Sequence, residues 1–96
     1  MSRYFTLYDT TGTARYQTLA TSATSAKSTA INGRRITILT NEVAALVAFG
    51  TSTVVATTAS CVIPANSALD FNFVSGQYVA AIATTGTGYL TIIDAD

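Results

Sequence analysis

The residues of this chain that could do chemistry are few and far apart in sequence. The chain has no histidine and a single cysteine, Cys61, so neither a Ser-His nor a Cys-His nucleophile pair can form. A serine–lysine pair would have to use Lys27, near Ser25 and Ser28, but the surrounding Thr/Ser/Ala sequence offers nothing to desolvate the amine. We therefore expect a protein that is not an enzyme, with Cys61 as a small, buried, reduced side chain.

Candidate ligand sites are equally weak. Asp94 with Asp96, or Asp70 with Asn72, could offer oxygen ligands to Ca²⁺. However, carboxylates two residues apart are typical of a solvated strand face or a chain end, and no EF-hand loop is present. The Gly-Thr-Gly segment at 86–88 lacks the lysine and the following helix of a phosphate-binding loop, so we interpret it as a hairpin turn. The sequence predicts neither a metal nor a cofactor.

The charged residues are divided unequally along the chain. Residues 1–35 hold all five basic side chains and one acid, Asp9, for a net charge of +4, whereas residues 36–96 hold four acids and no base. Such asymmetry is evidence about partners rather than about fold. An excess of four charges is too small to predict nucleic-acid binding. The basic residues either protect strand edges from aggregation or contact another protein surface, and both interpretations stay open.

Composition and turn spacing indicate an all-β fold. Thr, Val, Ile, Tyr and Phe dominate, and turn signals recur about every ten residues, which is typical of a β-sandwich or barrel. We predict a single small β-sandwich of jelly-roll or immunoglobulin-like type with an extended N-terminal arm. The Thr/Ser/Ala-rich sequence before Ile31 divides the chain into an arm with strands over 1–30 and a sandwich body over 31–96. The predicted strands are 3–8, 15–20, 26–31, 34–39, 43–49, 52–57, 60–63, 68–74, 77–83 and 88–93.

Two local patterns carry specific expectations about these strands. Asn32-Gly33 lies between the strands predicted at 26–31 and 34–39, and this dipeptide favours a two-residue type I′ hairpin turn. Residues 69–73 alternate strictly between apolar and polar side chains, as in a strand with one face in the core and one in water.

The segment 43–49 is apolar on both faces. A helix is an alternative here, because Asn41 could cap its N-terminus and Gly50 could end it, but we favour a strand because the rest of the chain is β. A strand that is apolar on both faces is explained if its second face meets another subunit. The residues predicted for this oligomer interface are Ala44, Leu46 and Ala48.

The order of several short motifs resembles a known group of proteins. The motifs are AFGTS at 48–52, IPAN at 63–66, the aromatic strand FNF at 71–73, GQYVAAI at 76–82 and TGYLT at 87–91. They lie within residues 36–93, and this stretch resembles small structural proteins on the heads of tailed bacteriophages. The resemblance implies a β-sandwich decoration (cement) protein that binds the capsid exterior, usually as a symmetric homo-oligomer.

We therefore expect a structural virion protein that decorates and stabilises the capsid exterior and is made in the host cytoplasm. Its expected partners are the major capsid protein and further copies of itself, as a trimer or else a dimer, with no nucleic acid and no membrane. The alternatives are a carbohydrate-binding or adhesive β-sandwich module and a tail- or fibre-anchoring virion protein. The residues predicted to contact the capsid are Arg3, Phe5, Leu7, Arg15, Leu19, Arg34 and Arg35.

Overall fold

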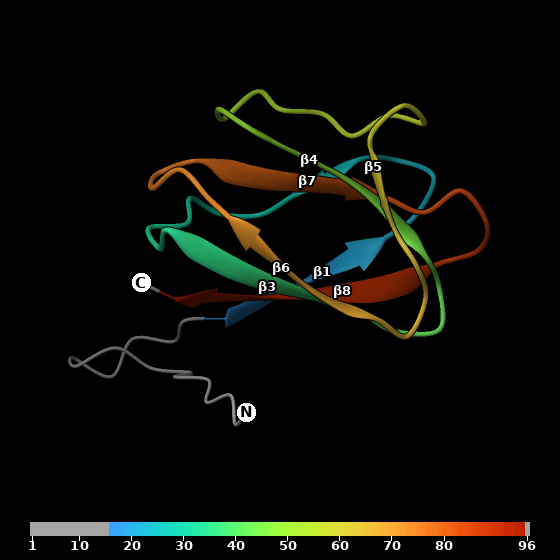
Figure 1. The fold of residues 1–96 in the computed structure, drawn as a ribbon. Helices are drawn as coiled ribbons and strands as arrows, with labels where there is room; N and C mark the ends of the chain where they lie inside the picture. Colours follow the sequence, from blue (N-terminus) through green and yellow to red (C-terminus); the bar gives the residue numbers. More distant parts are fainter. Residues whose placement is uncertain (1–15, 96) are drawn as a thin grey trace, which may run out of the picture.

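The β-branched and aromatic residues form eight strands in the computed structural model, which describes residues 16–95 (Figure 1). No helix occurs in this part of the chain, and so none that could cross a membrane. The strands are β1 (Tyr16–Thr21), β2 (Ala26–Lys27), β3 (Arg35–Thr40), β4 (Ala45–Gly50), β5 (Cys61–Ile63), β6 (Ala68–Asn72), β7 (Tyr78–Ile82) and β8 (Gly88–Ala95). The prediction of an all-β chain is confirmed.

The strands form two four-stranded antiparallel sheets that pack together as a small sandwich (Figure 1). Sheet 1 has the order β1-β8-β3-β6, and sheet 2 has the order β2-β7-β4-β5. β1 contacts β2, so these two sheet edges lie on one side of the sandwich and the edges β6 and β5 lie on the other.

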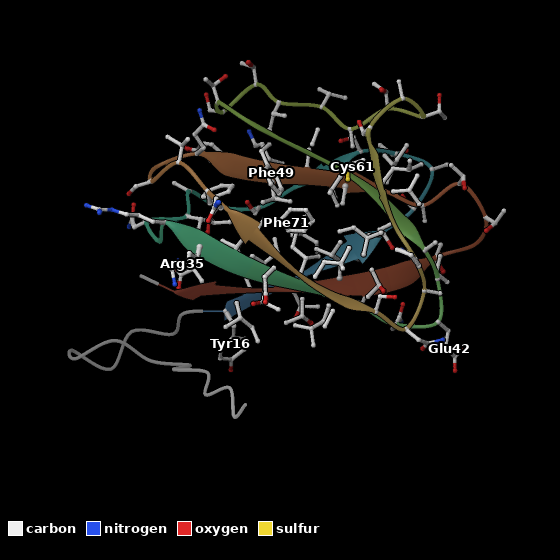
Figure 2. The ribbon with its side chains drawn as sticks, in the orientation of Figure 1. Tyr16, Arg35, Glu42, Phe49, Cys61 and Phe71 are labelled. Atoms are coloured by element: carbon white, nitrogen blue, oxygen red, sulfur yellow. The ribbon has the colours of Figure 1, made fainter. Side chains whose placement is uncertain are left out.

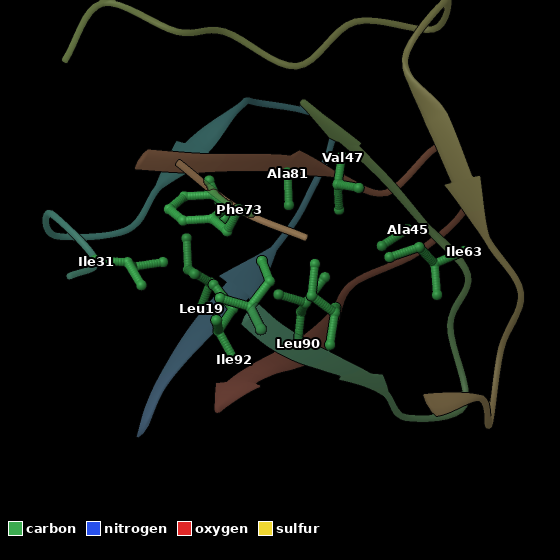
Figure 3. Packing of buried hydrophobic residues seen from close by; sticks show 12 residues of the cluster. Leu19, Ile31, Ala45, Val47, Ile63, Phe73, Ala81, Leu90 and Ile92 are labelled. Atoms are coloured by element: carbon green, nitrogen blue, oxygen red, sulfur yellow. The ribbon is translucent and has the colours of Figure 1, made fainter. Parts of the chain in front are cut away.

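The core lies between the two sheets (Figure 3). Along β3 and β8 every second residue points inward, and the largest fully buried side chains of sheet 1 come from these two central strands. Phe49 of β4 packs edge-to-face on Phe71 and Phe73, with ring centroids 5.4 and 5.2 Å apart. Burying each large aliphatic side chain contributes about 1.5–3 kcal/mol to the free energy of unfolding. The inward-facing side chains of β3 and β8 therefore hold the two sheets together. The central members of the core are Ile36, Ile38, Val47, Ile63, Val79, Leu90 and Ile92.

Residues 51–60, which we call the cover segment, lie across the outer face of sheet 2 instead of forming the strand predicted at 52–57. Ala56 of the cover segment, with the partly buried Val54, packs on Leu46 of β4 and on Ala80 and Ile82 of β7. These side chains form a second apolar cluster behind the main core. The β4 strand is therefore apolar on both faces because the chain covers its second face itself.

Polar contacts hold the cover segment in place. The Ala56 amide donates to Ser25 Oγ at 3.0 Å, which ties the segment to the loop before β2. Lys27 Nζ donates to the Ser52 carbonyl and lies 5.1 Å from the centre of the Tyr78 ring. A cation over an aromatic face is attracted by the ring quadrupole.

The strand favoured for 43–49 is confirmed as β4, so the helix alternative is wrong. The structure corrects two predictions about local pairing. The Asn32-Gly33 hairpin is wrong: β2 pairs with β7, whereas β3 pairs with β6 and β8 in the other sheet. The Gly-Thr-Gly segment at 86–88 is likewise not a hairpin turn, since it lies in the connection from β7 of sheet 2 to β8 of sheet 1. Local turn chemistry could not reveal that these connections cross between sheets.

Part of the predicted N-terminal arm takes part in the sandwich. Residues 16–21 form an edge strand of sheet 1, and residues 26–27 form an edge strand of sheet 2. The strand predicted at 3–8 lies outside the described residues.

Candidate functional site

The outer face of sheet 1 differs from that of sheet 2, because no described residue lies across it as the cover segment lies across sheet 2 (Figure 1). On β8, Leu90 and Ile92 point into the core, so Tyr89, Thr91 and Ile93 between and beside them point outward. The antiparallel register places residues 16, 18 and 20 of β1 opposite residues 93, 91 and 89, so all six share the outer face. We call this surface the sheet 1 face.

Two tyrosines dominate the sheet 1 face. Tyr89 is 60% exposed and Tyr16 is 44% exposed. Because Tyr16 lies opposite Ile93, the two rings start about 14 Å apart along the strand direction. Thr18 and Thr91 lie between them, with their hydroxyl oxygens 3.5 Å apart. The centre of the face is therefore a row of hydroxyls between two exposed aromatic rings.

The charged groups of this face gather toward β3 and β6. Arg35 begins β3 and is exposed (Figure 2). Arg34, which precedes it in the chain, is exposed as well. On β6, the Asp70 carboxylate accepts a hydrogen bond from Thr37 Oγ1 at 2.6 Å, which fixes its position on the outer surface. Residues 16–95 carry three basic and three acidic side chains in total, so this part of the chain is formally neutral.

The side chains of the sheet 1 face are suited to contact with another surface. Among residues 16–95 there is no group of three or more His, Cys, Asp or Glu side chains that could hold a metal ion. Tyrosines combine a large apolar ring with a hydroxyl donor, and they are enriched where proteins bind one another. The chemistry available on the sheet 1 face is aromatic contact, hydroxyl hydrogen bonding and a few charges at one side.

The structure places some of the predicted capsid-contact residues on the surface and one in the core, and it does not describe the others. Arg34 and Arg35 are exposed, and Arg35 lies on the sheet 1 face. Leu19 is 6% exposed and belongs to the core cluster, so a partner cannot reach it in this structure. The other predicted contacts lie outside the described residues: Arg3, Phe5, Leu7 and Arg15.

The structure removes the reason for the predicted oligomer interface, which was that the second apolar face of this strand needed another subunit to cover it. Leu46 is only 7% exposed and lies under the cover segment, while Ala44 is exposed before β4 begins and Ala48 is half-buried. A second subunit is not needed to cover Leu46. Cys61, predicted to be buried, is exposed, because β5 is a three-residue strand at the edge of sheet 2.

Sequence reasoning did not select the two tyrosines. Tyr89 could have been selected from the sequence, because strict alternation with Leu90 and Ile92 in an apolar strand predicts that Tyr89 faces outward. Tyr16 could not be found in the same way, since its position depends on pairing with the opposite end of the chain.

Comparison of this chain with family models, with curated proteins and with solved structures gave no match.

Proposed function

We propose that this chain is a structural virion protein that decorates and stabilises the exterior of a phage capsid and that it contacts the capsid through the sheet 1 face. The observation that carries the proposal is the contrast between the two outer faces. One is covered by residues 51–60, and the other presents two exposed tyrosines and Arg35. The resemblance of 36–93 to head-decoration proteins points to the same class.

The strand order supports a jelly-roll assignment. In the eight-stranded jelly roll the chain winds back and forth between two sheets, and the orders β1-β8-β3-β6 and β2-β7-β4-β5 fit that winding. Immunoglobulin-type sandwiches group strands one, two, five and four in one sheet, which differs from the order here. Jelly rolls occur in viral capsid proteins and in lectins, so the fold is compatible with both leading functions without deciding between them.

The proposed contact would draw its affinity mainly from apolar surface. Tyr16 and Tyr89 bury ring area against the capsid, while Arg34 and Arg35 guide the approach to an acidic surface and are individually worth only about 0–1 kcal/mol at an exposed rim. Residues 1–15, with Arg3, Phe5, Leu7 and Arg15, extend the same contact. A homo-oligomer, trimer or dimer, would present several sheet 1 faces at once and gain avidity.

Binding to capsids that lack the protein tests this proposal. The purified chain should co-sediment with expanded heads and raise the temperature at which they release DNA. Heads of closely related phages and an unrelated β-sandwich protein serve as controls. If the chain bound to no expanded head, the proposal would be wrong. Binding to tails but not to heads would favour the tail- or fibre-anchoring alternative.

A carbohydrate-binding module is the second candidate, and one observation favours it. The row of Thr18 and Thr91 hydroxyls between the exposed rings of Tyr16 and Tyr89 is an uncharged surface on which a neutral sugar chain could lie. Glycan arrays probed with the purified chain separate the two functions. Saturable binding to one glycan class, lost in Tyr89→Ala, together with no capsid binding, would support the carbohydrate alternative.

A further inference from the structure

We propose that Asn32-Gly33 is a site of self-modification, at which the chain converts Asn32 to aspartate or isoaspartate without an enzyme and with the assistance of the Ser75 hydroxyl. The reacting groups are the Asn32 side-chain amide, the Gly33 backbone nitrogen and water. None of these residues belongs to the proposed capsid contact. The inference therefore goes beyond the proposed function and stands whether or not the chain binds capsids.

The dipeptide Asn32-Gly33 lies in the connection that carries the chain from sheet 2 to sheet 1, and it is the one Asn-Gly pair in the sequence. Its asparagine is exposed. Backbone hydrogen bonds hold the residues on both sides of it. The Gly76 amide donates to the Ile31 carbonyl at 2.7 Å. The Phe73 amide donates to the Arg34 carbonyl, also at 2.7 Å. The dipeptide is therefore a short stretch between two anchored ends.

The proposed reaction is an intramolecular substitution at the side-chain amide. A base from solvent removes the Gly33 N–H proton, and the nitrogen attacks Asn32 Cγ, so that an N–Cγ bond forms. The Cγ–Nδ2 bond then breaks and ammonia leaves, which closes a succinimide ring. Because the reacting atoms belong to neighbouring residues, no second molecule has to be oriented for the attack.

Water then opens the succinimide ring. It adds to one of the two ring carbonyls, the bond from that carbon to the nitrogen breaks, and the nitrogen takes back a proton. Addition at Cγ gives aspartate, and addition at the backbone carbonyl carbon of Asn32 gives isoaspartate. The balance is one water consumed and one ammonia released, with no oxidant and no reductant.

The reacting groups of the dipeptide are not blocked by neighbouring residues. Gly33 has no Cβ, so no side chain of the attacking residue obstructs its nitrogen, and a glycine backbone reaches conformations that other residues rarely adopt. Within residues 16–95, no hydrogen bond to another residue holds the Gly33 amide or the Asn32 side chain. Neither the nucleophile nor the leaving group is therefore restrained by a described contact.

Ser75 supplies a hydrogen-bond donor where the reaction develops negative charge. Its hydroxyl donates to the Asn32 carbonyl at 2.8 Å. That carbonyl and the Gly33 nitrogen belong to one peptide unit, so loss of the N–H proton spreads negative charge onto the same oxygen. A donor to this oxygen stabilises the charged form more than the neutral form. Ser75 therefore favours the deprotonated nitrogen, which is the species that attacks.

Folding creates the contact between Ser75 and Asn32, which are 43 residues apart in sequence. Ser75 lies in a turn in which the Gln77 amide donates to the Val74 carbonyl at 3.2 Å. The turn also requires Gly76, whose φ of 90° is a conformation that favours glycine. The fold thus holds the Ser75 hydroxyl beside the dipeptide, and an unfolded chain would lose this contact.

The product changes both charge and backbone at this connection. A carboxylate at position 32 changes residues 16–95 from three basic and three acidic side chains to three and four, for a net charge of −1. Isoaspartate also routes the backbone through Cγ, which lengthens the chain between the anchored Ile31 and Arg34. We therefore expect the modified protein to separate from the original chain on an ion-exchange column.

Ageing of the folded full chain at mildly alkaline pH tests the proposal. Mass spectrometry of the tryptic peptide 28–34 should show that the side-chain NH2 group of Asn32 is replaced by OH, at a rate that rises with pH. Asn41 is the internal control. Its Oδ1 accepts from the Val43 and Tyr89 amides at 3.3 Å each, and a larger residue than glycine follows it. Gly33 is buried, so folding could instead prevent the attack. A folded chain in which Asn32 is no more modified than Asn41 would overturn the proposal.

Variants of Ser75 and Gly33 test the assigned roles. Ser75 is exposed, so its substitution leaves the core intact. In the folded chain, Ser75→Ala should slow the modification about 3- to 10-fold, as for the loss of one hydrogen bond to a developing charge, whereas Ser75→Thr keeps the hydroxyl and the rate. In guanidinium chloride these three chains should react equally, because the contact is lost. Gly33→Ala should slow the reaction by about 10-fold in the unfolded chain as well, so this result does not depend on its folding. Equal folded-state rates for Ser75→Ala and the unchanged chain, or a Ser75→Ala effect that persists in guanidinium chloride, would overturn the proposal.

Discussion

Thr40 illustrates how one side chain holds separate elements together. It is buried at the end of β3, where its hydroxyl donates to the Pro64 carbonyl at 2.6 Å and accepts from the Ser67 amide at 3.1 Å. Those two partners lie in the turn that carries the chain from β5 to β6, which crosses between the sheets. No buried side-chain nitrogen or oxygen in the described part of the chain lacks a hydrogen-bond partner.

Thr40→Val tests this role, since valine has nearly the same shape but no hydroxyl. The change leaves the Pro64 carbonyl and the Ser67 amide without this partner, and we expect a loss of about 1–3 kcal/mol in the free energy of unfolding. Thr40→Ser keeps the hydroxyl and should cost clearly less. Urea denaturation of the two variants provides the comparison; a smaller loss for valine than for serine would contradict the assigned role.

Leu46 is buried on the outer face of sheet 2 by the cover segment. It lies beneath Val54 and Ala56, so Leu46→Asp would place a carboxylate in an apolar cluster. We expect this change to lower the free energy of unfolding by more than about 3 kcal/mol, whatever the oligomeric state. The half-buried Ala48 on the same strand face is the matched control, and Ala48→Asp should cost less. A stable Leu46→Asp protein with a reduced mass would restore the interface predicted from sequence.

At the scale of elements, β1 belongs to the fold although sequence composition placed it in an arm. It pairs along its whole length with β8, and Leu19 is part of the core. Deleting residues 1–15 keeps every described member of the core cluster, and we expect the melting temperature to change by no more than a few degrees.

Deleting residues 1–24 removes β1 as well. The loss of Leu19 burial alone is worth about 1.5–3 kcal/mol, which corresponds to at least about 6 °C in melting temperature for a domain of this size. Thermal melts of the two truncated chains by circular dichroism make the comparison. Equal melting temperatures would show that β1 contributes nothing to stability.

Most strand positions in the described residues were predictable from sequence, whereas strand partners were not. The alternation of Leu69 and Phe71 with polar residues marked β6 correctly, because alternation depends only on neighbouring residues. The Asn32-Gly33 hairpin failed because the strands on either side of it pair with distant strands in different sheets. The cover segment was mistaken for a strand since its Thr/Val sequence has β propensity, and only the fold shows that it lies on Leu46.

One part of the candidate site could be predicted from sequence and another part could not. Exposure of Arg34 and Arg35 follows from their charge and could be expected from sequence. The pairing of Tyr16 with the strand that holds Tyr89 could not, because it joins the two ends of the described chain. Non-local pairing thus created the sheet 1 face from residues that no local motif connects.

In the whole molecule, residues 51–60 cover the outer face of sheet 2, and none of the described residues 16–95 covers the sheet 1 face in that way. The described residues are formally neutral, so long-range attraction to a partner must come from the placement of charges rather than from their sum. In the proposed contact, the basic residues Arg34, Arg35, Arg3 and Arg15 supply this attraction. We propose that the protein binds the capsid through the sheet 1 face.

Capsid binding by two matched surface variants tests this proposed contact. Tyr89 on the sheet 1 face is 60% exposed and Val55 on the cover segment is 61% exposed, so an aspartate at either position leaves the core intact. We expect Tyr89→Asp to weaken co-sedimentation with expanded heads about 5- to 30-fold, as for the loss of one central aromatic contact, and Val55→Asp to bind like the unchanged protein. Full binding by Tyr89→Asp, together with lost binding by Val55→Asp, would contradict the account.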